Sequence, residues 1–256
     1  MHNPHPSPVS LPWLEPGDDF PEPSRAWGPS DPAPGLLAGG GALDVATLVR
    51  AYCAGVFPWF SKGQPILWWS PDPRMVLNVD NFTVHRSLRK TLKRCAADSR
   101  CDVRMDTAFD KVIRACADPA ARQTGTWIVP EMISAYQQLH RAGLAHSVET
   151  WINGELVGGL YCVAIGQAVF GESMFSRIPD ASKIALAGLV AFCRHYGIRI
   201  VDCQQNTAHL DSLGAREIPR SEFLDRVRGA SALPGPEWRF DSRYWVEILG
   251  SKGPSA

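Results

Sequence analysis

The pattern of apolar and polar residues in the second half of the chain predicts a small sheet, one helix and one further strand. In order, three strands, a helix and a strand cover residues 146–152, 156–165, 168–175, 181–196 and 198–203. Asn153-Gly154 and Gly166-Gln167 are hairpin signals between the first three strands. Asp180 opens the helix and Gly197 closes it. An antiparallel meander followed by a helix and a strand is typical of the α+β class.

The first half of the chain has a more varied pattern. Asp44 is the predicted N-cap of a helix over 45–54, and helical spacing predicts another helix over 130–142. Residues 57–74 combine aromatic residues with prolines, which indicates a rigid region of loops and strands. Ten of the 21 prolines lie within residues 1–34, so this segment is predicted to be extended or disordered.

Charge is balanced over the whole chain but not along it. Lys and Arg number 26 and Asp and Glu number 26, so a nucleic-acid contact would have to be a local patch. Residues 81–122 hold ten Lys and Arg against five Asp. Within a predicted helix over 85–94, one face carries Arg86, Arg89, Lys90 and Lys93. This face fits two interpretations equally well, a solvated helix surface or a contact for nucleic-acid phosphates.

The cysteines and the apolar segments point to a cell compartment. Seven cysteines are scattered without a CxxC pair, which predicts neither a disulfide framework nor a zinc site and favours a reducing cytoplasm. The most apolar long segment, 156–170, is too short to cross a bilayer and lies between Glu155 and Glu172. We therefore expect a soluble cytoplasmic protein with no membrane contact and no metal.

The strand ending at residue 204 carries the first candidate chemistry. Period-two alternation puts Asp202 and Gln204 on one face, so a carboxylate and an amide project together where the strand meets a loop. Mixed sheets commonly build their sites at strand ends. The alternative is a structural Asp202 that caps nearby backbone. Cys203 falls on the opposite face, which predicts a core residue rather than a nucleophile.

A second candidate lies in the strand over 168–175. Phe170, Glu172 and Met174 share one face of a regular strand. A carboxylate between an aromatic ring and a thioether is costly unless it is paired. The pattern predicts a pocket that accepts an apolar side chain and a cation side by side. A buried Glu172 neutralised by an arginine is the alternative.

Several signatures of other chemistries are missing from the sequence. It has no Walker loop, no GxGxxG after a strand, no HExxH and no GxSxG. What remains is a set of polar side chains in an aromatic cleft, without a metal cluster or an obvious covalent nucleophile. Such a site suits a reaction whose substrate arrives already activated.

A series of longer motifs runs in order through residues 35–224. The motifs are GLLA at 35–38, AY through GVFPWFS at 51–61, PILWWSPDPR at 65–74, GTWI at 125–128, AHSVE at 145–149, LVGGLY at 156–161, GESMFS at 171–176, ASK at 181–183, DCQ at 202–204, SLGA at 212–215 and IPR at 218–220. Together they resemble the leucyl/phenylalanyl-tRNA–protein transferase family. One loop differs, because residues 39–44 read GGGALD where the family usually has Asp directly after two glycines.

The resemblance implies a domain organisation and a reaction. A small N-terminal domain over 35–74 would precede a GNAT-like acyltransferase domain over 75–228 with a mostly antiparallel central sheet, flanked by the extension 1–34 and a tail over 229–256. The donor would be leucyl- or phenylalanyl-tRNA, with methionine a poorer donor, and the acceptor a protein beginning with Arg or Lys. The product would be marked for degradation. No cofactor is implied, and we expect a monomer.

The resemblance also implies roles for particular residues. Asp202, hydrogen-bonded to Gln204, would polarise the acceptor amine, and Glu172 would hold the cationic acceptor. The amine proton would be removed either by Asp202 or with the help of the terminal 2′-hydroxyl of the tRNA. The substrate-binding residues would be Trp59, Trp127, Phe170, Met174 and Ser176. Both tryptophans would pack on the terminal adenosine or frame the pocket, and ordinary core packing is the alternative for them. The basic helix face would contact tRNA.

Two other functions compete with this one. A CoA-dependent N-acyltransferase would cradle pyrophosphate in a Gly-rich loop before the central helix. Residues 176–182 contain no glycine, and Pro179 lacks a backbone donor. A non-catalytic module that binds tRNA or a degradation signal is the other alternative.

Overall fold

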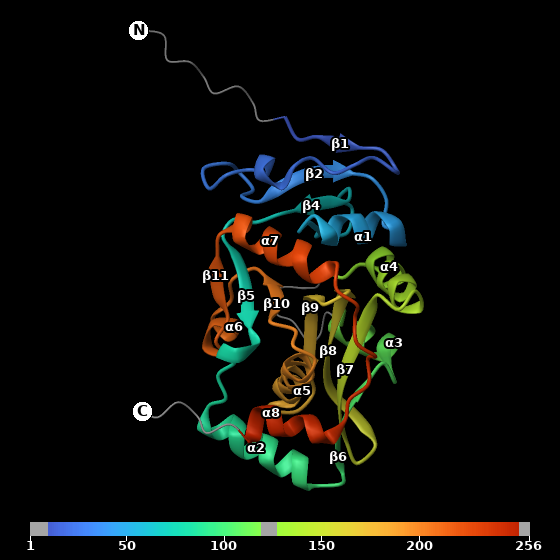
Figure 1. Ribbon diagram of the computed structural model, residues 1–256. Helices are drawn as coiled ribbons and strands as arrows, with labels where there is room; N and C mark the ends of the chain where they lie inside the picture. The colour runs from blue at the N-terminus through green and yellow to red at the C-terminus, as the bar shows by residue number, and fades with distance from the viewer. Residues whose placement is uncertain (1–9, 119–126, 251–256) are drawn as a thin grey trace.

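A computed structural model describes residues 10–118 and 127–250, which form two sheets (Figure 1). The smaller has the strand order β1-β2-β4-β3 and the larger β11-β5-β10-β9-β8-β7-β6. The expectations for residues 1–9 and 251–256, and for the first two residues of the GTWI motif, lie outside the described residues.

The first part of the chain forms the small sheet and one helix, which lies between its second and third strands in the sequence. Its strands and helix are β1 (Trp13–Leu14), β2 (Leu36–Gly40), α1 (Val45–Cys53), β3 (Phe57–Pro58) and β4 (Leu67–Trp69). As predicted, Asp44 caps α1, accepting a hydrogen bond from the Thr47 backbone at 2.9 Å. Aromatic side chains close the sheet, with Phe20 edge-on to Trp68 at 4.8 Å between ring centroids.

The proline-rich segment belongs to this small sheet, so the predicted boundary at residue 35 is too late. β1 runs parallel to β2, with Trp13 opposite Gly39 and Leu14 opposite Gly40. A Cβ on Gly40 would lie 2.9 Å from the Trp13 ring, so glycine permits this close approach. The short turn η1 (Pro23–Arg25) follows β1. Prolines flank a strand only two residues long, where few backbone donors are needed.

The large sheet confirms the predicted α+β class with a mostly antiparallel sheet. Its strands are β5 (Arg74–Asn78), β6 (Cys101–Met105), β7 (Ala145–Ile152), β8 (Glu155–Ile165), β9 (Ala168–Ser176), β10 (Ile200–Gln204) and β11 (Arg216–Ile218). β6 to β9 form an antiparallel meander, and β9 and β10 are the parallel neighbours in this sheet.

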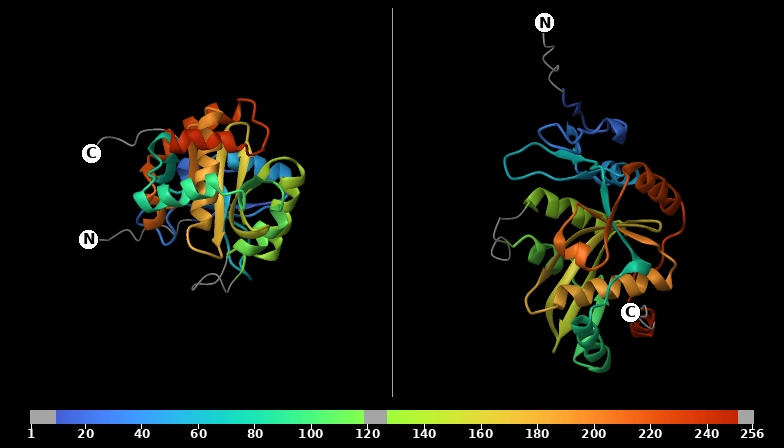
Figure 2. Two further views of the ribbon diagram at one scale, coloured as in Figure 1. Left: turned by 90° about the horizontal axis from the view of Figure 1, so that it is seen from below. Right: turned by 90° about the vertical axis from the view of Figure 1, so that its left-hand side faces the viewer.

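Helices cover both faces of the large sheet. α3 (Phe109–Cys116) and α4 (Pro130–Arg141) pack on one face, and α5 (Ala181–His195) and α2 (Arg86–Ala97) pack on the other. The view from below in Figure 2 shows the yellow strands between green α3 and α4 and orange α5. The remaining helices are η2 (Val79–Asn81), α6 (Ala208–Ser212), α7 (Arg220–Ser231), η4 (Ser242–Trp245) and α8 (Val246–Leu249).

As predicted, α5 begins directly after Asp180, which has a left-handed φ of 64° and pairs through its side chain with Lys183 at 2.8 Å. One local expectation is corrected. Cys95 and Cys101 form a disulfide between the end of α2 and the start of β6. The described part of the C-terminal tail packs on the body, because Trp245 and Ile248 are buried in the same core as α5. Among the described residues, no helix is long and apolar enough to cross a membrane.

The feature of the fold that matters for function is the point where β9 and β10 separate. They pair only at Val169 with Val201 and at Phe170 with Asp202. Beyond that pair, each strand bulges against its other neighbour: Glu172 is the extra residue of β9 against β8, and Cys203 is the extra residue of β10 against β5. Bulges re-aim side chains and are common beside active sites.

Candidate active site

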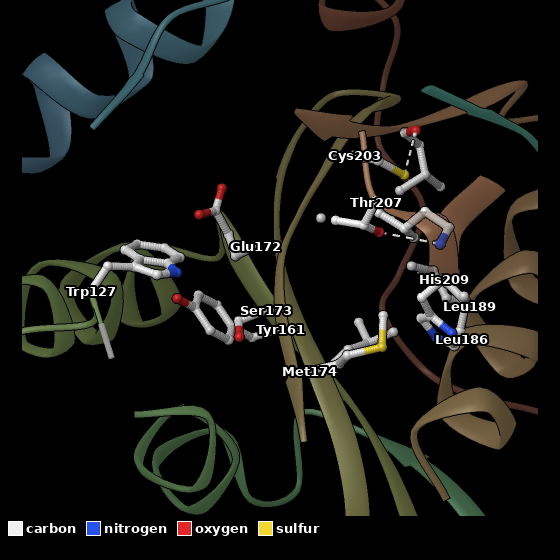
Figure 3. A pocket seen from close by; sticks show the side chains of 14 residues that line it. Trp127, Tyr161, Glu172, Ser173, Met174, Leu186, Leu189, Cys203, Thr207 and His209 are labelled. Atoms are coloured by element: carbon white, nitrogen blue, oxygen red, sulfur yellow. Dashed lines mark hydrogen bonds between the residues drawn. The ribbon is translucent and has the colours of Figure 1, made fainter. Parts of the chain in front are cut away.

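A cavity of about 230 Å³ opens where β9 and β10 diverge (Figure 3). Its apolar lining comes from β8, β9 and α5, and its polar lining from the bulges and the segment that leads into α6. The lining residues are Trp127, Leu160, Tyr161, Gly171, Glu172, Ser173, Met174, Leu186, Leu189, Val201, Cys203, Thr207, His209 and Leu210. The cavity therefore offers space for an apolar group next to one carboxyl group.

Glu172 is held by two phenols and an amide. The hydroxyl of Tyr52 donates to its Oε1 at 2.6 Å, and that of Tyr136 to its Oε2 at 2.9 Å. Gln204 Nε2 donates to Oε1 at 3.1 Å. Both phenols are buried, which raises their pKa well above the usual value and keeps them protonated as donors.

The environment of Glu172 favours its neutral form more than water does. Burial raises the pKa of the Glu172 carboxyl to about 7, although the two phenol hydrogen bonds act in the opposite direction. The nearby charge of Asp202 raises this pKa further, and Arg74 lowers it. Within the described part of the chain, no cationic side chain forms an ion pair with Glu172. The interpretation of a Glu172 neutralised by a buried arginine is therefore wrong.

Asp202, unlike Glu172, forms an ion pair with an arginine. Arg74 Nε and Nη2 bind the two oxygens of Asp202 at 2.8 Å and 2.6 Å, and both side chains are 1% exposed. The rings of Phe57 and Phe223 lie 4.8 Å and 4.5 Å from the guanidinium carbon. A carboxylate locked in a buried bidentate pair is poorly placed to take a proton from a substrate.

Of the three polar side chains predicted to lie together, those of Glu172 and Gln204 contact each other and that of Asp202 does not join them. Gln204 reaches Glu172 through its side chain, as described above. Asp202 contacts Gln204 only through the Gln204 backbone N–H, at 2.9 Å, and does not line the cavity. The bulge at Cys203 breaks the alternation assumed for this strand, and Gln204 takes a left-handed φ of 62°. Cys203, predicted to be a core residue, packs against the core beneath α5 and also lines the cavity; burial raises the pKa of its thiol to about 12.

The predicted substrate-binding residues divide into two groups. Trp127 and Met174 line the cavity. Phe170 packs in the core against Tyr52, with ring centroids 5.0 Å apart, and Trp59 packs against Trp69 at 5.4 Å. Neither ring lines the cavity.

Ser176 and Met174 also depart from the predicted pattern. Ser176 Oγ donates to the Ile178 carbonyl at 2.7 Å and accepts from the Ser182 backbone at 3.2 Å, so it shapes the turn before α5. The bulge at Glu172 places Met174 with the core beneath α5, whereas Phe170 belongs to the core on the α4 side. The shared face predicted for Phe170, Glu172 and Met174 is therefore wrong.

The basic face of α2 lies away from this cavity, at the opposite end of the large sheet from the small sheet (Figure 1). Leu88 and Leu92 are buried beneath it, as predicted. The surface carries Arg86, Arg89, Lys90 and Lys93 around a shallow recess. No ion pair to these four side chains occurs among the residues the structure describes, so their charge is available to a partner.

Sequence reasoning missed Tyr52, Tyr136 and Arg74. Tyr52 and Tyr136 are separated by 84 residues, and each is a buried residue of its helix. The only signal was general, because a buried phenol needs a hydrogen-bond partner. Arg74 stands at the start of a strand of apolar residues, where a buried cation requires a buried anion.

The site combines an apolar cavity with the carboxyl of Glu172, whose pKa burial raises to about 7, and the family to which the chain belongs is one of transferases. The chain belongs to the leucyl/phenylalanyl-tRNA protein transferase family. The family's model matches residues 76–228, and the model of its N-terminal domain matches residues 41–72.

Several relatives and solved structures are similar to the chain. A leucyl/phenylalanyl-tRNA–protein transferase of Albidiferax ferrireducens is 60% identical over 94% of this chain and 96% of its own. Those of a Polaromonas species and of Burkholderia multivorans are 58% and 54% identical, with at least 96% of each chain covered. A structure of FemX gives a TM-score of 0.42 at 10% identity, over 68% of this chain and 66% of that one. L-PGS from Bacillus licheniformis gives a TM-score of 0.39 at 11% identity, over 84% and 73%.

Proposed function

We propose that this protein transfers leucine or phenylalanine, and methionine less well, from aminoacyl-tRNA to the N-terminal Arg or Lys of acceptor proteins. The observation that carries the proposal is the carboxyl of Glu172, without a cationic partner, at the edge of an apolar cavity. The apolar aminoacyl side chain occupies the cavity, next to Leu160 and Leu186. The product is marked for degradation, and the reaction takes place in the cytoplasm.

The reaction needs a proton acceptor beside an activated ester. The acceptor α-amine has a pKa of ~7.7–8 and arrives largely protonated at neutral pH. Ionised Glu172 binds the ammonium group and takes its proton. The amine nitrogen then attacks the ester carbonyl carbon, a C–N bond forms, and the bond to the tRNA ribose oxygen breaks. The proton on Glu172 passes to that leaving oxygen, which restores the carboxylate, and the second proton that the nitrogen loses on becoming an amide is released to solvent.

The other polar residues support this step in different ways. Gln204 fixes one oxygen of Glu172, while Tyr52 and Tyr136 fix both. Asp202 and Arg74 anchor the end of β10, so Asp202 acts on the site through the backbone of Gln204. Asp202 thereby becomes a positioning residue in place of the amine-polarising role that the family resemblance implies.

The turn before α5 argues against a CoA enzyme. A pyrophosphate loop needs free backbone N–H groups. Here the N–H groups of Arg177, Ala181 and Ser182 donate to Val157, Ile178 and Ser176, respectively. A phosphate group would have to displace three existing hydrogen bonds.

Leucyl-tRNA and a peptide beginning with Arg provide the direct test. We expect the peptide to gain one leucine, with full activity in the presence of a chelator and without CoA. A matched peptide with an acetylated N-terminus lacks the nucleophile and should stay unmodified. Leucine-independent acetylation from acetyl-CoA would support the CoA alternative, and tRNA binding without any transfer would support the binding module. Loss of transfer on chelation would contradict the metal-free mechanism.

A further inference from the structure

A second, wider groove lies on the α3 side of the large sheet, separate from the cavity at Glu172. It has a volume of about 890 Å³. The C-terminal half of α3, the tip of the β7–β8 hairpin and the end of β9 form its walls. Three cationic side chains and one indole line it, from Lys111, Arg114, Arg177 and Trp151.

The groove carries positive charge that is not neutralised within it. Lys111 and Arg114 are exposed one helical turn apart, and the described part of the chain gives neither an ion pair. Arg177 is held in place by a hydrogen bond to the Leu156 carbonyl at 3.1 Å. The lining also contains the carboxylates of Asp118 and Glu155, so the three cations exceed the acids by one.

The indole of Trp151 is fixed on the floor of the groove. Its Nε1 donates to the buried Glu149 at 2.9 Å, and the Arg104 guanidinium lies 4.7 Å from the ring centroid. A rigid aromatic ring among cations is the combination that binds single-stranded nucleic acid, because bases stack on the ring while phosphates meet the charges.

The groove and the cavity are linked along the chain by β9, because Glu172 lines the cavity and Arg177 lines the groove. Arg177 follows the last residue of β9, five positions beyond Glu172, which is ~17 Å along an extended chain. A single strand whose terminal residue occupies the cavity can therefore continue into the groove over a few nucleotides.

We propose that this groove binds the single-stranded 3′-terminal RNA of the donor, upstream of the residue that carries the amino acid. Phosphates contact Lys111, Arg114 and Arg177, and a base stacks against Trp151. The identity of the donor rests on the proposed function, whereas binding of RNA by the groove is measurable without any transfer reaction.

A short, unacylated single-stranded RNA ending in CCA is the probe, and its Kd is measured over a series of salt concentrations. The double variant Lys111→Ala/Arg114→Ala should bind it more weakly, with the salt slope reduced by ~0.7 for each lost phosphate contact. Trp151→Leu should weaken binding about tenfold, with an unchanged slope. The matched control Arg226→Ala/Arg228→Ala removes two exposed charges from α7 and should bind as wild type.

The same probe separates this groove from the basic face of α2. Arg89→Ala/Lys90→Ala should weaken the binding of whole tRNA and leave the short RNA unaffected. An unchanged Kd and salt slope for the Lys111/Arg114 variant would overturn the proposal, as would an equal loss in the α7 control. A raised KM for the acceptor peptide with unchanged RNA binding would assign the groove to the acceptor and also overturn it. Failed transfer by wild type alongside altered RNA binding would contradict only the proposed function.

Discussion

Two carboxylates on neighbouring strands, Asp202 on β10 and Glu172 on β9, have opposite environments. Asp202 is 1% exposed and receives two hydrogen bonds from Arg74 and one from the Gln204 backbone. Glu172 receives only neutral donors and lines a cavity. Burial acts on both groups, but only Asp202 has a cation to compensate for it.

The difference separates structural from chemical use of the same functional group. A carboxylate paired with an arginine in a buried bidentate contact fixes the chain around it. A buried carboxylate without a cation gains and loses a proton near neutral pH, which suits general acid–base work. The contrast leads us to expect that mutations at Asp202 mainly affect folding and that mutations at Glu172 mainly affect transfer.

The largest expected effect is on the transfer rate of Glu172→Gln. This variant keeps the shape and removes the group that accepts the proton; its single amide oxygen can accept from only one of the two phenols, and its amide nitrogen would donate to the other. We expect transfer to fall by roughly 10²–10⁴-fold in single-turnover assays with saturating leucyl-tRNA. Glu222→Gln, an exposed change on α7, is the control and should retain near-normal transfer. A Glu172→Gln variant with wild-type rates would remove the basis for our mechanism.

Asp202→Asn should affect stability more than any other single change at β10. It leaves the buried Arg74 charge without its partner, and breaking such a pair costs about 3–5 kcal/mol of unfolding free energy. Urea denaturation of the purified variant measures this loss. Replacing both partners, as in Arg74→Met/Asp202→Leu, should recover part of it because no unpaired charge remains. If Asp202→Asn melts like wild type but transfers poorly, Asp202 has a chemical role after all.

The pH dependence of transfer tests which group takes the proton. With the pKa of Glu172 at about 7, kcat/KM should fall about tenfold per pH unit well below that value, as Glu172 becomes protonated. Above the amine pKa of ~7.7–8 the cationic form of the acceptor disappears, so the profile should be bell-shaped. Tyr52→Phe removes a donor to the carboxylate, which should move the acid limb to higher pH. A profile that only rises to a plateau through pH 8 would mean that the free amine attacks without Glu172.

The sequence predicted the helices and strands of the large sheet better than it predicted the contacts between their side chains. The meander, α5 and β10 were predictable because each has a clear periodic pattern bounded by Gly, Asn or Asp. The prediction of which side chains face the site was wrong at two points, Glu172 and Cys203. At each of them a one-residue bulge shifts the alternation of side chains along the strand. A bulge leaves no distinctive composition, so a regular strand was assumed.

Contacts between distant elements were also beyond pattern analysis. The partners of Glu172 come from α1 and α4, and Arg74 reaches Asp202 across 128 positions of sequence. The resemblance identified Asp202, Gln204 and Glu172 as a group. Their different partners, and hence the division between anchor and proton acceptor, required the three-dimensional arrangement.

The smallest expected effect concerns the basic face of α2, which lies far from both carboxylates. If this face contacts tRNA phosphates, Arg86→Ala/Lys93→Ala should reduce the salt slope of tRNA binding by ~0.7–0.9 per lost contact and weaken affinity several-fold at low salt. The kcat at saturating tRNA should not change, because neither side chain approaches the cavity. Binding titrations at several salt concentrations measure the slope. The control Arg226→Ala/Arg228→Ala removes the same amount of positive charge from α7. Comparing the two double variants separates a lost tRNA contact from a general decrease in the protein's positive charge. A slope equal to that of wild type would show that α2 is a solvated face, and would leave RNA binding to surfaces nearer the cavity.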